Sequence, residues 1–292
     1  MSIKSYSFDK VVIVGVGLIG GSLALALRER QICKQIVGIT RSKASARSAL
    51  KLGICDEMFE DLKDPIKDAD LMVIATVPKD IVSTALSVQY MARDDLIITD
   101  VGSVKGEIVN EIESKLRSGL RFIGAHPIAG SEKSGPTAAF SSLFKDQYTI
   151  ITPTVNSDED ALSKVRYIWE SVGSKVVDLD PFEHDLSLAL ISHLPHMLAY
   201  SLVDTLKEAD RTNKLRKFIA GGFKSMTRVV ASPPEMWRDI FIFNKDAIIE
   251  SATIFERQFS LLKKRLESDD FGALESFLED MNKIKIEMDS DG

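Results

Sequence analysis

Cysteine is scarce in this chain of 292 residues, and an excess of positive charge is missing. The two cysteines, Cys33 and Cys55, are too few for a disulfide framework or a four-ligand zinc site, and they fit a reducing compartment. Lysine and arginine number 37 against 43 aspartate and glutamate residues, which gives a net charge of −6. A dedicated nucleic-acid-binding protein usually has the opposite balance or a basic block. We therefore expect a cytoplasmic protein with no metal site and no nucleic-acid partner.

Long hydrophobic runs are also rare, with one exception. The segment from Val11 to Leu27 is apolar apart from Ser22, so it looks like the hydrophobic part of a signal peptide. However, four glycines interrupt it, charged residues flank it on both sides, and no small-residue cleavage site follows. Its 17 residues are at the short limit for a membrane span. We interpret it as a buried strand, a turn and a helix, which predicts no targeting signal and no membrane association.

What the sequence does contain is a repeated alternation of strand and helix patterns. Hydrophobic residues make up 45% and charged residues 27%, an ordinary globular balance, and the length fits two domains. Short apolar runs, often β-branched, occur at 11–14, 36–39, 71–75, 96–99, 121–124, 148–152 and 175–179. Helical patterns lie between the earlier runs. This alternation predicts a doubly wound α/β fold with a parallel sheet.

The pattern changes at Asp180-Pro181, beyond which only long helical periods follow. We therefore predict two domains, residues 1–180 with the sheet and residues 181–292 with helices alone. Ser232-Pro233-Pro234-Glu235 is typical of a helix start, with Ser232 as the N-cap. The helix that it opens carries apolar residues at alternating three- and four-residue spacing as far as Leu266, with Lys245 as the one gap. Such a stripe predicts packing along another long helix, either within the subunit or across a dimer.

A glycine motif follows the first predicted strand directly. Gly15, Gly17 and Gly20 form G-x-G-x-x-G at the opening of a helix. The first glycine allows a tight turn, the second a close approach of a pyrophosphate, and the third a close contact between helix and strand. The amides of Leu18 and Ile19, at the positive end of the helix, would bind the phosphates. In this context the motif predicts a Rossmann-type dinucleotide site rather than a structural turn.

The end of the second strand usually distinguishes the two nicotinamide cofactors. An acidic residue there would bind a ribose 2′-hydroxyl, whereas an arginine would accommodate a 2′-phosphate. The strand is followed by Thr40, Arg41, Ser42 and Lys43, with no carboxylate at this corner. Arg41 suits a bidentate contact with phosphate. We therefore expect NADP, with NAD as the alternative, although a solvated basic turn would give the same pattern.

Three polar loops follow later strands, at the sheet edge where α/β proteins bind ligands. Thr76 and Val77 follow the strand at 71–75 and should line the cofactor site. Ser103 comes after the next strand, where we expect it to be exposed at the start of a helix. His126 ends the strand that begins at 121. Because an imidazole accepts a proton near neutral pH, His126 is the strongest candidate for a general base.

Five motifs together resemble the prephenate/arogenate dehydrogenase family. They are the segments Gly15–Ser22, Asp100–Lys105, His126–Gly135, Ser192–His196 and Gly221–Asp239. The resemblance covers nearly the whole chain. It implies a Rossmann domain followed by a helical domain that binds substrate and forms a homodimer. Because the two predicted domains account for all 292 residues, we expect none of the fused mutase or regulatory domains that some relatives carry.

The resemblance also implies a reaction, the oxidative decarboxylation of prephenate to 4-hydroxyphenylpyruvate or of arogenate to tyrosine. His126 would be the base bonded to the ring hydroxyl, and Ser103 would share that hydroxyl. Arg228 matches the arginine that holds a substrate carboxylate in a fork geometry. Glu132 is similar to the acidic residue at the site entrance, which can pair with that arginine. The sequence does not separate prephenate from arogenate.

Further substrate contacts follow from the same resemblance. In Ser192–His196 the family places contacts at the first serine and the last histidine, and their i, i+4 spacing puts them on one helix face, although Pro195 disturbs the turn. Trp237 matches a tryptophan near the site. Some relatives have an acidic residue where this chain has Ser225, which leaves the orientation of the arginine open. His184 falls in no motif, and we expect it to be exposed at a helix start.

Two other functions use some of these features. A β-hydroxyacid dehydrogenase also joins a Rossmann domain to helices, but it relies on a lysine in a glycine-rich helix that we do not find. A dinucleotide-sensing protein without catalytic activity would keep the glycine loop. It would not need His126, Ser103 and Arg228 together.

Overall fold

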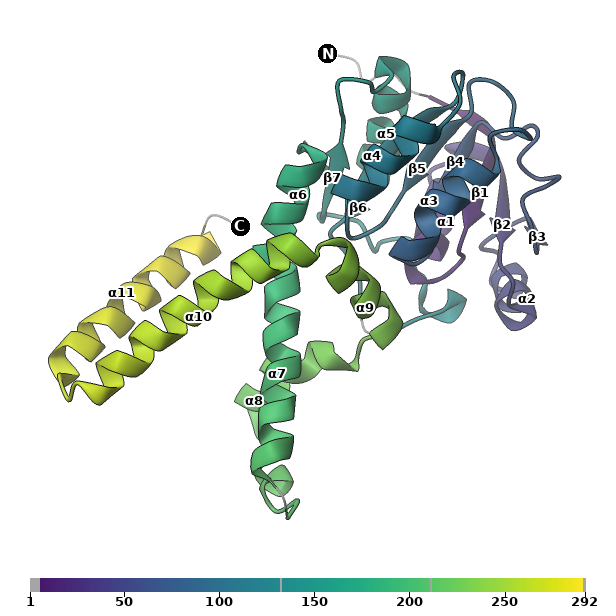
Figure 1. Ribbon diagram of the computed structural model, residues 1–292. Coiled ribbons are helices and arrows are strands. Elements are labelled where there is room, and N and C mark those ends of the chain that lie inside the picture. Colours follow the sequence, from purple (N-terminus) through teal and green to yellow (C-terminus); the bar gives the residue numbers. More distant parts are fainter. Residues whose placement is uncertain (1–5, 132, 211, 291–292) are drawn as a thin grey trace. The chain divides into compact units, whose positions relative to one another are not determined.

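Eight strands form one sheet in the computed structural model, which describes residues 6–131, 133–210 and 212–290 (Figure 1). The strands are β1 (Phe8–Val14), β2 (Cys33–Ile39), β3 (Glu57–Phe59), β4 (Leu71–Ile74), β5 (Ile97–Asp100), β6 (Arg121–Pro127), β7 (Tyr148–Thr152) and β8 (Lys175–Asp178). They lie in the order β3-β2-β1-β4-β5-β6-β7-β8, and the first six are parallel. The order 3-2-1-4-5-6 is that of a Rossmann sheet. The predicted fold class is therefore confirmed, with β7 added antiparallel to β6.

The central strands are apolar on both faces, as a parallel sheet between two layers of helices requires. In β1, Val11 and Ile13 belong to one buried cluster and Val12 and Val14 to another. Because successive side chains of a strand point to opposite faces, these clusters are the two faces of the sheet. Every predicted run overlaps an observed strand. Only the edge strand β3, with three residues, is too short for the sequence pattern to reveal.

Helices between the strands cover both faces. They are α1 (Leu18–Glu29), α2 (Lys43–Lys51), α3 (Pro78–Ser87), α4 (Gly106–Lys115) and α5 (Glu159–Ser171). Leu27 of α1 and Trp169 of α5 lie in one cluster, whereas Ile81 of α3 and Ile108 of α4 lie in the other. The loops at the carboxyl ends of β1, β4 and β5 therefore begin between the two helical layers, where ligands bind in this fold.

After β8 the described part of the chain contains helices only. They are α6 (Pro181–Leu188), the π-helix η2 (Ala189–His193), α7 (Leu194–Ala209), α8 (Gly221–Thr227), α9 (Pro234–Phe243), α10 (Lys245–Glu267) and α11 (Phe271–Ser290), with 3₁₀ turns η3 (Leu215–Phe218) and η4 (Arg228–Ala231). Helix α9 returns to the sheet, since Trp237 and Ile240 belong to the same buried cluster as Ile81 of α3.

Two details of the predicted helices are wrong. Helix α9 starts at Pro234 with Pro233 in the N-cap position, and no side chain caps it, so Ser232 is not the cap. The continuous helix expected from this start to Leu266 is instead two helices, separated at Asn244. Pro195 lies in the first turn of α7, directly after the π-helix η2, and the helical run from Pro181 to Ala209 continues through it. The irregular turn is the π-helix just before it.

The chain forms two compact units, residues 1–245 and 246–292. The second unit contains α11 and nearly all of α10, and the Arg265 guanidinium lies 4.4 Å from the centre of the Phe277 ring. Along α10, Leu262 is partly covered, whereas Phe259 and Leu266 are exposed. Part of the apolar stripe thus remains uncovered in a single subunit. The predicted domain boundary between residues 180 and 181 stays a prediction.

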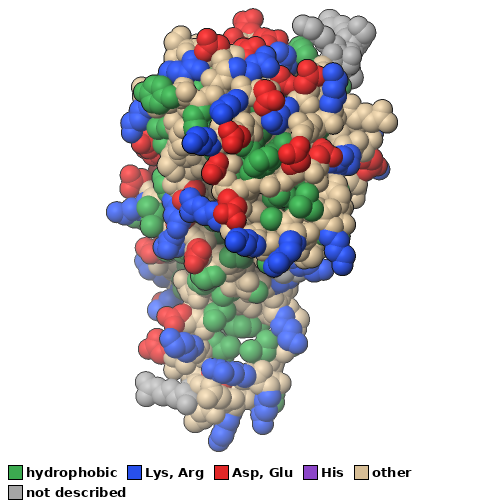
Figure 2. Space-filling model, turned by 90° about the vertical axis from the view of Figure 1, so that its right-hand side faces the viewer, with side chains coloured by type: hydrophobic (Ala, Val, Ile, Leu, Met, Phe, Trp, Pro, Cys, Tyr) green, Lys and Arg blue, Asp and Glu red, His purple; other side chains and the backbone are tan. Residues whose placement is uncertain are grey.

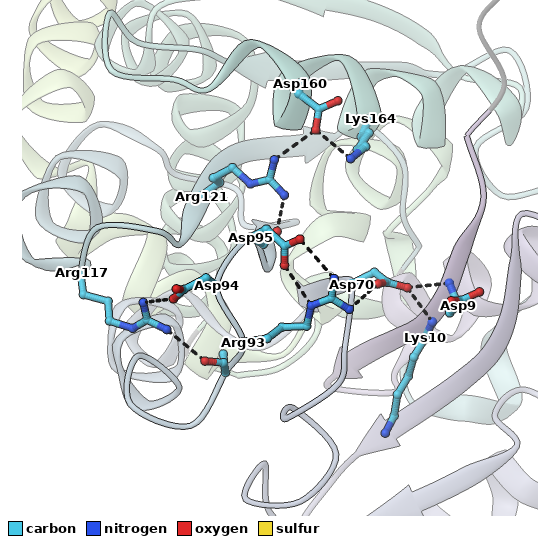
Figure 3. A network of polar contacts seen from close by, with 11 residues as sticks. Asp9, Lys10, Asp70, Arg93, Asp94, Asp95, Arg117, Arg121, Asp160 and Lys164 are labelled. Carbon is cyan, nitrogen blue, oxygen red and sulfur yellow. Dashed lines mark hydrogen bonds and ion pairs between the residues drawn. The ribbon is translucent and has the colours of Figure 1, made fainter.

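Ion pairs tie together the strand starts, at the edge of the sheet opposite the glycine loop (Figure 3). Arg93 bonds Asp95 just before β5 at 2.9 Å and Asp70 just before β4 at 3.1 Å. Asp70 in turn accepts from the amide of Lys10 in β1 at 3.0 Å. Arg121, at the start of β6, contributes another pair to this edge. Each exposed pair contributes little stability alone. Together, the pairs satisfy polar groups at the starts of the strands with partners from the same end of the sheet.

The surface is mixed over the sheet and more apolar over the helices. Figure 2 shows charges of both signs over the upper part, and hydrophobic side chains grouped lower, at the height of α7 and α8 in Figure 1. Within Pro181–Ala209, an 18-residue window reaches a mean hydropathy of 1.4, which by length and composition alone would suffice for a membrane span. Leu190 and Ile191 in this run are 51% and 70% exposed.

Candidate active site

Glycines shape the loop between β1 and α1. Gly15 has a φ of +95°, and a Cβ there would lie 2.4 Å from the carbonyl oxygen of Ala75, so a larger residue would displace the backbone. A Cβ at Gly20 would lie 2.3 Å from the carbonyl oxygen of Gly15. At Gly17, in contrast, a Cβ would meet nothing within 4 Å. The first and third glycines of the motif are thus required by the fold, whereas the second leaves an open approach to the backbone.

Polar groups without partners in the described part of the chain lie near the open space at Gly17. Helix α1 begins at Leu18 with Gly17 in the N-cap position and no side-chain cap. The amides of its first turn, including that of Ile19, therefore remain able to bind an anion. After β4, Val77 is the N-cap residue of α3, and the buried Oγ1 of Thr76 has no hydrogen-bond partner among the described residues. These groups fit the phosphates of a dinucleotide.

A cavity of about 720 Å³ lies beside the glycine loop. Its lining includes predicted cofactor residues, namely Gly15, Thr40, Arg41, Ser42 and Thr76. It also includes Glu60, Asp61 and Lys63. The expectation that no carboxylate lies at this corner is therefore wrong. The cause is the short strand β3, whose pairing with β2 brings the following loop to the corner, where the amide of Thr40 donates to the carbonyl of Phe59 at 3.0 Å.

A buried ion pair holds the loop after β5. Asp100 and Lys105 are both completely buried, and Nζ of Lys105 donates to Oδ2 of Asp100. The same carboxylate accepts from the amide of Gly102 at 2.8 Å and from the amide of Ala125 in β6 at 3.3 Å. Asp100 thereby fastens this loop to β6. Ser103 is half-buried within the loop, ahead of α4, rather than exposed at the start of the helix as expected.

His126 lies near the end of β6 and is only 9% exposed. Its Nδ1 is 2.8 Å from Nε2 of His184, and Nδ1 of His184 is 2.8 Å from Oδ1 of Asp185. The expectation that His184 is exposed is wrong, because this residue is completely buried. Helix α6 packs against α4 and β7, which turns His184 and Asp185 inward. No motif marks this pair, so only the tertiary packing reveals it.

Asp185 also connects this histidine pair to α4. Its Oδ1 accepts from the amide of Lys105 and its Oδ2 from the amide of Gly106, each at 2.8 Å. A carboxylate at a helix N-terminus satisfies unpaired amides and interacts favourably with the helix dipole. One buried carboxylate therefore caps α4 and contacts His184, which contacts His126.

All four histidines of the chain lie in this region, and the pKa of each is lowered. Burial is the largest cause in every case, because it disfavours the charged imidazolium. For His126, the charges of His184, Lys105 and His193 add to burial and hold the pKa well below its ordinary value. The pKa of His193 falls to about 4. Near neutral pH, His126 is therefore an uncharged imidazole with a lone pair.

A second group of predicted residues gathers around His196. Its ring stacks on Trp237, with centroids 3.4 Å apart and planes inclined by 22°. Nδ1 of His196 is 3.0 Å from the carbonyl oxygen of Ser192, so Nδ1–H donates and Nε2 keeps its lone pair. The positive charge of Arg228, exposed on η4, adds to burial in lowering the pKa of His196. These four predicted residues thus form one cluster.

Asn244 links the two histidine groups. Its Nδ2 donates to the carbonyl oxygen of Asp185 at 2.7 Å and contacts Nδ1 of His193 at 3.0 Å. His193 in turn meets Trp237 edge-on, with centroids 6.1 Å apart. Asn244 lies between α9 and α10, where one continuous helix was expected, and its buried side chain makes the contacts with Asp185 and His193. Glu132, the predicted entrance residue, lies outside the described residues.

Two family models match the chain in succession. "Prephenate dehydrogenase, nucleotide-binding domain" covers residues 23–178, and "Prephenate dehydrogenase, dimerization domain" covers residues 180–283. Prephenate dehydrogenase of Bacillus subtilis (strain 168) is 36% identical over 267 residues, which are 90% of this chain and 71% of that protein. The similarity therefore spans the sheet as well as the helices.

Solved structures give the same result. The crystal structure of prephenate dehydrogenase from A. aeolicus, in complex with hydroxyphenyl propionate and NAD+, has a TM-score of 0.92 at 35% identity and covers 98% of this chain and 100% of that one. Synechocystis arogenate dehydrogenase has a TM-score of 0.80 at 28% identity, covering 96% of this chain and 99% of that one. Fold and sequence thus agree over nearly the full length.

Proposed function

The chain belongs to the prephenate dehydrogenase family, and on this premise we propose that it catalyses the oxidative decarboxylation of prephenate or arogenate in tyrosine biosynthesis. A nicotinamide dinucleotide is the electron acceptor, and the product is 4-hydroxyphenylpyruvate or tyrosine. The observation that carries the proposal is His126, an uncharged buried imidazole at the carboxyl end of β6. The dinucleotide loop lies at the same edge of the sheet, so the substrate would be oxidised beside His126, where a base is needed to accept the hydroxyl proton.

The protein needs to form no covalent bond to the substrate in this reaction. A bound nicotinamide would supply the hydride acceptor for the ring carbon that carries the hydroxyl group. His126 accepts the hydroxyl proton as the carbon–oxygen bond of the alcohol becomes the double bond of a ketone. The ketone withdraws electrons through the ring, the ring carboxylate leaves as carbon dioxide, and the ring becomes aromatic. The phenolate oxygen that results takes back the proton from His126, which restores the base. The main tasks of the chain are therefore to orient the substrate and to accept one proton.

The remaining predicted residues orient the substrate or bind its carboxylate groups. In this proposal Ser103 shares the ring hydroxyl with His126, and its loop is fixed by Asp100 through the buried ion pair. Arg228 binds a substrate carboxylate in fork geometry. Ser192 and His196 contact the substrate, and Trp237 holds His196 by stacking. Glu132 acts at the entrance by family resemblance.

Steady-state kinetics with prephenate and arogenate, each with NAD and NADP, test this function. Formation of reduced nicotinamide is followed by absorbance, and the aromatic product is identified separately. His126→Asn should lower kcat by about 10²–10⁴ with little change in substrate binding, because it removes a general base. Folded protein that reduces neither cofactor with either substrate would refute the proposal. Wild-type turnover in the His126 variant would refute the role of that residue.

Within the same proposal, Arg41 contacts a 2′-phosphate and favours NADP. Arg41 and Lys63 supply positive charge at this corner, and Glu60 and Asp61 oppose it. Arg41→Ala should therefore raise KM for NADP at least about tenfold while changing KM for NAD much less, since a charge-assisted contact with phosphate is lost. Preference of the wild-type protein for NAD would contradict the assignment.

We also propose a homodimer formed through the helical region. A dimerization-domain model matches this region, and apolar side chains remain exposed on it, including Leu190, Ile191 and Ile286. Burying such side chains between two copies is favourable by about 25 cal/mol per Å². Ile191→Asp should therefore shift the mass measured by light scattering towards the monomer. Glu183→Gln, a change on the exposed side of α6, is the control.

A cytoplasmic location completes the proposal. Both cysteines are free, and burial raises the pKa of the Cys33 thiol to about 11 and that of Cys55 to about 12. These thiols stay protonated at neutral pH and are poor nucleophiles. Chains with few, unpaired cysteines suit a reducing compartment. Fractionation of the source cells with an antibody against the chain tests the location, and recovery in a membrane or secreted fraction would contradict it.

A further inference from the structure

The hydrogen-bonded chain from His126 through His184 to Asp185 has only one consistent arrangement of protons. Asp185 accepts from the amides of Lys105 and Gly106 at the N-terminus of α4, one with each carboxylate oxygen. An ionised carboxylate only accepts hydrogen bonds. Nδ1 of His184, at 2.8 Å from Oδ1 of Asp185, must therefore be the donor.

The tautomer of His184 determines that of His126. A neutral His184 that is protonated at Nδ1 has its lone pair at Nε2. That nitrogen lies 2.8 Å from Nδ1 of His126, so His126 donates from Nδ1. A neutral His126 then has its lone pair at Nε2, the nitrogen that is left to meet a ligand. Burial keeps both imidazoles neutral near pH 7 by lowering the pKa of each.

We propose that His184 and Asp185 are positioning residues, which fix His126 in the tautomer that presents Nε2 as the base, and that His184, beside the Asp185 carboxylate, accepts a proton from His126 during turnover. This inference rests on the proposed dehydrogenase function and extends it to two residues that touch neither substrate nor cofactor. The arrangement resembles the way in which an aspartate orients the histidine of a serine protease, with one additional imidazole between them.

The proton balance of the step is simple. The substrate O–H bond breaks and an Nε2–H bond forms on His126, which becomes an imidazolium. Its Nδ1 proton can then move across the 2.8 Å contact to Nε2 of His184, so the charge comes to lie next to the anion of Asp185. Nearby charges act on this shift in both directions. Lys105 and His193 oppose a cation here, and Asp185 and Asp100 favour it.

Nitrogen NMR of the histidine rings tests the tautomer without any substrate. The chain has only four histidines, so ¹⁵N-histidine labelling gives eight ring signals. Protonated and unprotonated ring nitrogens have well-separated chemical shifts, and His126→Asn identifies the signals of His126. Near pH 7.5 we expect Nδ1 of His126 to be protonated and Nε2 to be unprotonated. The opposite tautomer would overturn the proposal whether or not the protein turns over prephenate.

Two substitutions at His184 separate positioning from packing. His184→Leu removes the acceptor, so kcat should fall on the order of 10²-fold while KM changes less than about threefold. In His184→Gln the amide oxygen can accept from Nδ1 of His126, so the tautomer should be retained and kcat should recover to within about tenfold of wild type. Glu183→Gln on the same helix is the control, with an unchanged spectrum and unchanged kinetics.

The outcomes are distinct. A wild-type kcat in folded His184→Leu, or an equal loss of kcat in both His184 variants with an unchanged His126 tautomer, would overturn the proposal. If His184→Leu does not fold, His184→Gln and the wild-type spectrum still decide between the two tautomers. Failure of the wild-type protein to oxidise either substrate would refute the proposed function, whereas the NMR result would stand by itself.

Discussion

Replacing Lys105 by methionine should destabilise the protein strongly, because it leaves a buried charge without its partner. Lys105 and Asp100 are both completely inaccessible, and they pair directly. Methionine fills a similar volume but cannot donate a hydrogen bond. Asp100 would keep only the amides of Gly102 and Ala125, at 2.8 and 3.3 Å.

The size of the effect follows from what remains around Asp100. Removing one partner of a buried ion pair typically costs about 3–5 kcal/mol. Because two amides still stabilise the carboxylate, we expect the lower end, about 3 kcal/mol. For a protein of this size, that corresponds to a fall in Tm of about 6–12 °C. In the double variant Lys105→Met with Asp100→Asn, no charge is buried alone, so at least about half of the loss should be recovered.

Urea and thermal unfolding of the four members of this double-mutant cycle provide the test. Lys115→Met is the matched control, because its partner Glu111 lies on an exposed helix surface and the change should stay within about 0.5 kcal/mol. A loss below about 1 kcal/mol in Lys105→Met would refute the reasoning. A double variant that is less stable than the sum of the single changes would refute it as well.

The same variant has a consequence for pH dependence. The charge of Lys105 is one cause of the lowered pKa of His126. Without that charge the imidazolium is less disfavoured, so the pKa of His126 rises. The acid limb of the kcat/KM profile should then move to higher pH. A limb that stays in place would show that Lys105 does not act on the base.

Three further predictions concern the whole site. The unfolding free energy should fall as pH drops from 6.5 towards 4, because the buried histidines have lowered pKa values and bind protons in this range only when the protein unfolds. Each such histidine contributes a slope of up to about 1.4 kcal/mol per pH unit. Equal stability at pH 7.5 and 5.5 would contradict this prediction. Gly15→Ala should lower Tm, whereas Gly17→Ala should leave Tm unchanged and weaken dinucleotide binding measured by calorimetry, since a Cβ at Gly15 would clash with the carbonyl oxygen of Ala75 and one at Gly17 would meet nothing within 4 Å. Trp237→Leu should raise KM for substrate about tenfold through loss of the stack on His196, with little effect on KM for the dinucleotide.

Most of the fold could be predicted from the sequence because its signals are local. The run Val11–Val14 and the glycines after it specify a buried strand and a tight turn wherever they occur. The strand β3 escaped prediction because three residues at a sheet edge carry no periodic pattern. The break at Asn244 escaped for a different reason, since its one sign in the sequence is the gap in the apolar spacing at Lys245, which a continuous helix can also contain. Its cause is a side chain that contacts Asp185 and His193, which are far away in the sequence.

The candidate site was predictable only where a motif marks it. His126, Ser103 and the residues around His196 lie in recognisable segments, and the fold gathers the last group into one cluster. His184 has no such signal. A histidine four residues after Asp180, at the start of a helix, is most often exposed. Packing of α6 against α4 buries it, and this contact depends on residues that are about 80 positions apart, such as Gly106 and Asp185.

Asp185 makes the chemistry of the base depend on the packing of helices. The same carboxylate caps α4 and determines which nitrogen of His184 is protonated. Until α4 and α6 pack, His126 has no fixed tautomer, and the loop that carries Ser103 lacks the cap at its end. Loss of this carboxylate should therefore weaken the fold and the base together, whereas loss of the His184 imidazole should affect mainly the base. This difference is the reason to test the tautomer at His184 and not at Asp185.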